Sequence, residues 1–82
     1  MEVVISPDLL DVMADERMVE IVEAAMTEKL AVKRMQGRGG WHTRACSIGA
    51  LKGMLEEHVE KGDMVDVLNI AGMILARQQA GY

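Results

Sequence analysis

The sequence contains no phenylalanine and only one residue each of tryptophan, tyrosine, proline and cysteine. The single Cys46 excludes a disulfide within the chain and any zinc site built from cysteines alone. No apolar run approaches the length that spans a membrane, and the acidic N-terminal segment lacks the features of a signal peptide. A free thiol is typical of a reducing compartment, so we expect a cytoplasmic protein that has no contact with a membrane.

The chain is also short, which limits its fold and its core. Its 82 residues allow one domain, over residues 1–82, and leave no room for a doubly wound sheet or a barrel. A chain of this size buries only about 60% of its unfolded surface, so its core is marginal. A partner subunit often supplies the missing stability. We therefore expect an aliphatic, methionine-rich core and a homo-oligomer, most simply a dimer.

The net charge of −4 conceals a strong segregation of charge along the chain. Residues 1–28 carry eight acids and one base, residues 29–52 carry six bases and no acid, and residues 53–82 carry five acids and two bases. The basic block has two readings, a docking patch for an acidic partner or complementarity to a helix dipole. The overall acidity makes double-stranded DNA an improbable partner.

Apolar spacing and capping residues predict an all-α fold. Ser6-Pro7 is typical of a helix start, and helical spacing continues over residues 6–36 as one long helix, or as two helices with a break near Ala14. A glycine-rich loop follows over residues 37–46. We expect further helices over residues 47–61 and 63–79.

The short link at Gly62 predicts that these two helices form an antiparallel hairpin. Gly49 and Gly53 lie on one side of the first of them, where we expect a neighbouring backbone to approach closely. The spacing predicts buried stripes in the two helices, which comprise Ile48, Leu51, Leu55 and Val59, and Val67, Ile70, Ala71, Ile74 and Leu75, respectively.

Carboxylates crowd the turn of the predicted hairpin, where their oxygens offer the ligands that Mg²⁺ prefers. Their spacing resembles that of the MazG-type nucleoside triphosphate pyrophosphohydrolases, which place a Glu-Glu-x-x-Glu helix and a Glu-x-x-Asp helix around Mg²⁺. Here only Lys61-Gly62 separates the two motifs, and aspartate replaces the first acid of the second. The matching residues are Glu56, Glu57, Glu60, Asp63 and Asp66. The alternative is a solvated helix end followed by a helix cap.

Other combinations of reactive residues are weaker. His42, Cys46 and His58 would make an incomplete zinc site of no standard spacing. A Cys–His nucleophile pair lacks a third orienting residue, and a buried structural thiol is the simpler interpretation of Cys46. The sequence therefore shows no convincing catalytic set.

The glycine-rich loop and its flanks carry the candidate partner-binding residues. Arg38-Gly39-Gly40-Trp41 combines a cation with the only tryptophan, and residues of these types dominate binding energy at interfaces. The alternative for Trp41 is an anchor that holds the loop against the helices. The predicted partner-binding residues are Arg34, Arg38, Trp41 and Arg44.

From Gly37 onward the chain resembles a family of small phage and prophage accessory proteins, some of which carry a nucleotide diphosphohydrolase label. Relatives usually have proline where this chain has Met64. The resembling stretches are Gly37-Arg38-Gly39-Gly40-Trp41, Cys46-Ser47, Glu57-His58-Val59-x-Lys61-Gly62-Asp63 and Val65-Asp66-Val67-x-Asn69. The resemblance implies a helper protein that is made during infection or lysogeny and acts in the host cytoplasm.

Two functions follow as expectations. The first is a non-enzymatic helical protein that binds and modulates or inhibits a host or anti-phage defence protein, without a cofactor. The alternative is a Mg²⁺-dependent nucleotide pyrophosphohydrolase, in which Lys52 or Arg38 meets the phosphates.

Overall fold

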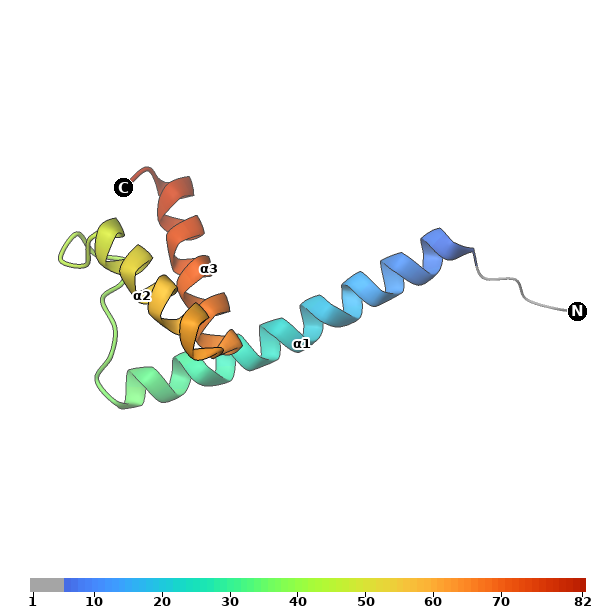
Figure 1. Cartoon of the computed structure of the whole chain (residues 1–82), viewed down its shortest axis with the longest axis horizontal. Helices are drawn as coiled ribbons and strands as arrows, with labels where there is room; N and C mark the ends of the chain where they lie inside the picture. The colour runs from blue at the N-terminus through green and yellow to red at the C-terminus, as the bar shows by residue number, and fades with distance from the viewer. Residues whose placement is uncertain (1–5) are drawn as a thin grey trace, which may run out of the picture.

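The computed structural model describes residues 6–82, which form three helices and no strand. The helices are α1 (Pro7–Met35), α2 (Ile48–Lys61) and α3 (Met64–Ala80). The molecule is elongated, with extents of 61 × 27 × 23 Å, because α1 runs far beyond the region where α2 and α3 pack (Figure 1). The predicted all-helical class is confirmed.

Local hydrogen bonds fix the helix ends where the sequence predicts them. The side chain of Ser6 accepts from the amide of Leu9 at the start of α1, and Ser47 accepts from Ala50 at the start of α2. Gly62 ends α2 with a φ of 75°, a left-handed conformation that favours glycine. These caps satisfy backbone groups that a helix end leaves unpaired.

α1 is one unbroken helix of 29 residues, so the alternative of two helices divided near Ala14 is wrong. Asp15, which the sequence offered as a second cap, lies exposed within the helix instead. Helix continuity here follows from the surrounding residues, because between Pro7 and Met35 the helix contains no proline or glycine that would interrupt it.

The hydrophobic core is small and centres on α3, which packs against both α1 and α2. Its buried apolar residues are Leu51, Ile70 and Ile74, and partly buried neighbours extend it. The predicted stripes are right only in part, because Val59, Ala71 and Leu75 are exposed. In α3 the buried face is rotated toward polar residues that the apolar pattern did not select.

Close helix packing occurs at a different glycine from the predicted pair. A Cβ on Gly53 would meet nothing within 4 Å, and one on Gly49 would meet only the Ser47 side chain. A Cβ on Gly72 of α3 would instead lie 3.3 Å from Cε of Met26 on α1. The absence of a side chain on Gly72 therefore allows α3 to pack closely against α1.

The first half of α1 lies outside this core. Every residue from 6 to 21 is exposed, and α1 has no buried residue along its whole length. Figure 1 shows this half extending away from α2 and α3. No helix in residues 6–82 combines the length and apolarity that crossing a membrane requires.

Candidate functional site

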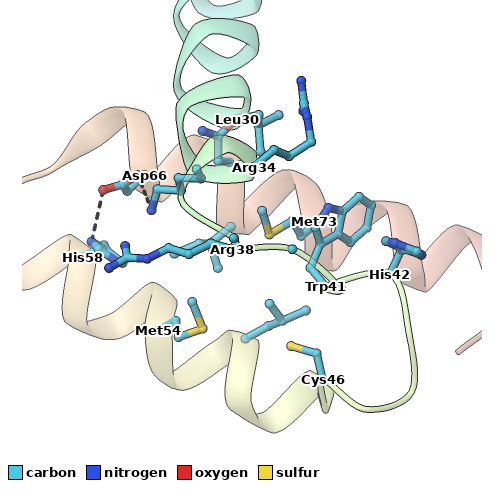
Figure 2. Close-up of a pocket in the computed structure, with 17 residues that line it drawn as sticks. Leu30, Arg34, Arg38, Trp41, His42, Cys46, Met54, His58, Asp66 and Met73 are labelled. Atoms are coloured by element: carbon cyan, nitrogen blue, oxygen red, sulfur yellow. Dashed lines mark ion pairs between the residues drawn. The ribbon is translucent and has the colours of Figure 1, made fainter.

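A cavity of about 640 Å³ lies where the end of α1, the glycine-rich loop, α2 and α3 meet (Figure 2). Its volume falls within the range of roughly 300–1,000 Å³ that is usual for small-molecule sites. Apolar side chains from three elements line one part of it, among them Leu30, Met54 and Met73. Polar and charged side chains line the remainder, so the cavity has two chemically distinct parts.

Beside the cavity, α3 buries three polar residues and only two apolar ones. Asp66, Asn69 and Arg77 are only 4%, 3% and 3% exposed. Buried polar side chains destabilise a fold unless they find partners. The contacts of these three side chains therefore decide whether they stabilise or destabilise this region.

Asp66 finds its partners in two lysines at the end of α1. The Nζ atom of Lys33 lies 3.0 Å from Oδ1 of Asp66, and that of Lys29 lies 3.8 Å from Oδ2. Burial raises the pKa of Asp66, but hydrogen bonding with Asp63 and Lys33 and the charges of both lysines outweigh it, so the net pKa is lowered. Asp66 is therefore ionised at neutral pH and ties α3 to α1.

His58 of α2 faces the same carboxylate. Its Nδ1 atom lies 3.7 Å from Oδ2 of Asp66, which is too long for a hydrogen bond. Among residues 6–82, Nδ1 of His58 has no hydrogen-bond partner, although it is buried. This buried imidazole nitrogen faces the Asp66 carboxylate (Figure 2).

Arg77 does not line the cavity but holds the loop that forms one of its walls. It donates from Nη1 to the carbonyl oxygens of Trp41, at 3.1 Å, and Cys46, and from Nη2 to that of Tyr82, at 3.2 Å. Its guanidinium lies 4.8 Å from the ring centroid of Tyr82, whose hydroxyl donates to the carbonyl of His42. The buried arginine therefore holds the loop and the C-terminal residue together.

The predicted partner-binding residues separate into two groups in the structure. Trp41 is half-buried, packs against the core and lines the cavity, as the alternative of a loop anchor describes. Arg34 and Arg38 are exposed and line the cavity, whereas Arg44 is exposed but does not. Figure 2 shows the Arg38 side chain crossing the cavity toward His58.

The structure brings only part of the predicted carboxylate cluster together. Glu56, Glu57 and Glu60 are exposed on α2. Ligand atoms of His58, Asp63 and Asp66 lie within 4.8 Å of one another, and this is the group in residues 6–82 with the spacing of metal ligands. The lysines already neutralise Asp66, so a cation would have to displace them, and the donor set is explained as an ion-pair network.

The considered zinc ligands do not gather. His42, Cys46 and His58 form no common group among the described residues. Cys46 is a free, partly buried thiol that packs against the core. It also lines the cavity, and its role as a structural thiol stays a prediction.

Sequence reasoning missed the buried polar residues of α3. Asp66, Asn69 and Arg77 follow one another at intervals of three and eight residues, which places them near one line along a helix. Such a polar line beside an apolar stripe was the available signal. The stripe itself drew attention because apolar periodicity is the primary sign of a buried face.

A second functional feature is the uncovered face of α1. Val12, Val19 and Met26 recur at intervals of seven residues and so lie along nearly the same side of the helix. α3 covers this side at Met26, whereas Val12 and Val19 are 48% and 57% exposed. Large exposed apolar residues accompany them in the same half of the helix, namely Leu9, Leu10, Met13, Met18 and Ile21.

Comparison with known proteins finds no matching protein family, no similar curated protein and no similar solved structure.

Proposed function

We propose that this chain is a small helical interaction protein that binds another protein through the exposed first half of α1, which carries Val12, Val19 and the other exposed apolar residues of that half. The observation that carries the proposal is a 29-residue helix with no buried residue. Concentrated apolar exposure of this kind marks protein interaction sites. A helix that is this long and uncovered gains its stability from packing against a partner.

A second copy of the chain is the first occupant that we propose. The first half of α1 is acidic, whereas its last turn carries Lys33 and Arg34. Parallel pairing of two α1 helices would set acids against acids. Antiparallel pairing sets the acidic half of one copy beside the basic end of the other, with Arg34 and Arg38 exposed there.

Burial of the exposed apolar residues of α1 against a partner also supplies the stabilising free energy that the small core lacks. Covering an exposed Val, Leu or Met side chain against a partner stabilises by about 1.5–3 kcal/mol when burial is complete. The summed burial energy of several such side chains is comparable to the total unfolding free energy of about 5–15 kcal/mol that is typical of domains. Association is therefore the arrangement that this chain length favours.

The resemblance to phage accessory proteins extends the proposal to function in the host cytoplasm. There the interaction protein would bind and modulate or inhibit a host or anti-phage defence protein. The exposed arginines Arg34, Arg38 and Arg44 suit an acidic surface on that partner. Trp41 contributes less to such an interface, because it already packs against the core.

The alternative, a Mg²⁺-dependent pyrophosphohydrolase, has less support from the geometry. It needs several carboxylates that converge on a cation with room for phosphates. Three of its five acids are exposed on α2, and Asp66 already pairs with Lys33 and Lys29. An interaction protein does not need these carboxylates to converge or the Asp66–lysine pairs to break.

A site-specific photocrosslink tests the proposal in cells. The crosslinking amino acid p-benzoylphenylalanine is placed at Val19 in the exposed half of α1, and in a control at Gln78, which is exposed on α3 outside that half. We expect light-dependent adducts from position 19 and few from position 78. Mass spectrometry then identifies the captured chain as a second copy or as a different protein.

The position dependence decides the outcome. Adducts of one defined mass that form only from position 19 support a specific interface on the exposed first half of α1. Equal labelling from both positions, or no adduct from either, contradicts the proposal. A probe at Leu9, exposed near the start of α1, reports the direction of pairing: a cross-linked peptide from the Lys33–Arg38 region of a second copy would support antiparallel pairing, whereas one from around Leu9 itself would contradict it.

A further inference from the structure

The apolar wall of the cavity is accessible from outside the molecule. Met54 of α2 lines the cavity and is 41% exposed. Leu30 and Trp41, which are half-buried, line it from the end of α1 and from the loop (Figure 2). A volume of about 640 Å³ would hold a drug-sized ligand, and therefore also a few apolar side chains from a docked helix.

The charge of the cavity restricts what can dock there. Arg34 and Arg38 line it and are exposed, whereas Lys33 and Asp66, which also line it, pair with each other at 3.0 Å. These four side chains sum to a positive charge. A segment that docks here should therefore combine apolar side chains with acidic ones.

The chain itself contains such a segment at the start of α1. Its apolar side chains are 47–52% exposed and it carries two acids and no base. About 30 Å of continuous helix separates this segment from the cavity of its own molecule, so only the segment of another copy can enter. The segment, named the α1 start below, comprises Asp8, Leu9, Leu10, Asp11, Val12 and Met13.

Antiparallel pairing of two α1 helices brings the α1 start to the cavity. When the pair is centred on Ile21, the middle residue of α1, Val12 of one copy lies opposite Leu30 of the other, and Asp8 lies opposite Arg34. Val12 and Leu30 are about five helical turns apart, so they lie on the same side of α1. A two-fold pair requires this, because the same side of both helices meets and both cavities are filled together.

We infer that the cavity is the docking pocket for the α1 start of a second copy of this chain. The inference rests on the proposed antiparallel pairing and adds the place where each free helix end docks. The apolar side chains of the α1 start pack against Trp41 and Met54, while its acids face Arg34 and Arg38.

Two measurements on the full chain test the docking. Sedimentation velocity over a dilution series gives the dissociation constant of the dimer. Trp41 is the only tryptophan of the sequence, so its indole N–H gives a unique signal in a ¹H–¹⁵N NMR spectrum. We expect this signal to shift in proportion to the dimer fraction across the same series.

Met54→Glu and Met64→Glu form a matched pair of variants. Both replace an exposed methionine by an acid, but Met64 does not line the cavity. Met54→Glu should weaken the dimer at least about tenfold, because it places a charge among apolar side chains and repels the acids of the α1 start. Met64→Glu should change the dissociation constant by less than about twofold. Met54→Leu, which keeps the apolar contact, should retain the wild-type dimer.

The inference needs both readouts, and either one alone can overturn it. A dimer that forms without a shift of the Trp41 signal contradicts docking in the cavity, and so does equal weakening, or none, in the two glutamate variants. The interface on α1 would survive these results if the probe at Val19 still forms adducts. Absence of a dimer at every concentration would also overturn the inference, whereas adducts from Val19 with a different protein would keep the proposed function.

Discussion

The two ends of this molecule use similar side chains in opposite ways. The first half of α1 and the region formed by α2, α3 and the end of α1 both contain regularly spaced Leu, Val, Ile and Met residues. In the second region Leu51 is 1% exposed, whereas Leu10 in the first is 52% exposed. The difference lies in the neighbours, because α3 covers only the last turns of α1. Apolar spacing thus states which face can be buried, and packing decides whether it is.

The buried polar groups differ between the two regions as well. Around α3 an aspartate, an asparagine and an arginine are enclosed, and two of them hold other elements in place. The acids of the first half of α1 are exposed and hold nothing except a solvated pair between Arg17 and Glu20 at 3.4 Å. Such exposed pairs contribute little stability. Three matched pairs of substitutions test this contrast.

The largest effect is expected for matched leucine truncations. Leu51→Ala should lower the free energy of unfolding by between about 3 and 4 kcal/mol, because it removes a fully buried side chain and leaves a cavity. Leu10→Ala should lower it by less than about 0.5 kcal/mol. Urea unfolding, at concentrations where the chain is monomeric, measures both. Similar losses in the two variants would show that the first half of α1 is packed within the monomer.

Arg77→Ala should lower the free energy of unfolding by about 3 kcal/mol, because three carbonyl oxygens lose a charged donor. The loop that Arg77 holds contains Arg44, so trypsin should cleave after Arg44 faster in this variant. Gln78→Ala, at an exposed neighbouring position, should change neither the stability nor the rate of cleavage. Unaltered cleavage in the Arg77 variant would mean that other contacts hold the loop.

Asp66→Asn should lower the free energy of unfolding by about 2 kcal/mol at neutral pH, because Lys33 and Lys29 lose their carboxylate. The pKa of Asp66 is lowered in the folded protein, so its ionised form favours folding. This contribution is complete above about pH 4, the ordinary pKa of aspartate, and is lost as the pH falls through the lowered folded-state value.

The gap between wild type and the Asp66 variant should therefore narrow as the pH falls below about 4. Asp15→Asn, on the exposed half of α1, should show no gap at any pH. Denaturant unfolding across a pH series measures both variants. A gap that stays constant down to low pH would contradict the proposed role of the Asp66 charge.

Much of the fold was predictable because helix ends depend on local interactions. Ser6, Ser47, Gly62 and Asp63 act within a few residues of their own position, so their residue types suffice to place them. The break near Ala14 was a wrong alternative, since Asp15 has the type of a cap but lies within a continuous helix. Local propensity permits a start there without requiring one.

The candidate site was far less predictable. The sequence indicated Trp41 and Arg38, which line the cavity, and Asp66, though as a metal ligand rather than a partner of lysines. Asn69 and Arg77 were not selected, because a polar side chain looks solvated until its neighbours are known, even where it lies in line with another along a helix. Glu56, Glu57 and Glu60 drew attention through their spacing, yet the fold leaves them on the surface.

By itself, the sequence determined an all-helical chain, the capping residues of its helices and a first helix with more apolar surface than the rest of the chain can cover. The tertiary structure decided which face of α3 is buried, which acid becomes paired and where the cavity forms. The physical reason is the range of the interactions. A cap is made within one turn of helix, whereas the Lys33–Asp66 pair and the hold of Arg77 on the loop exist only once distant segments meet.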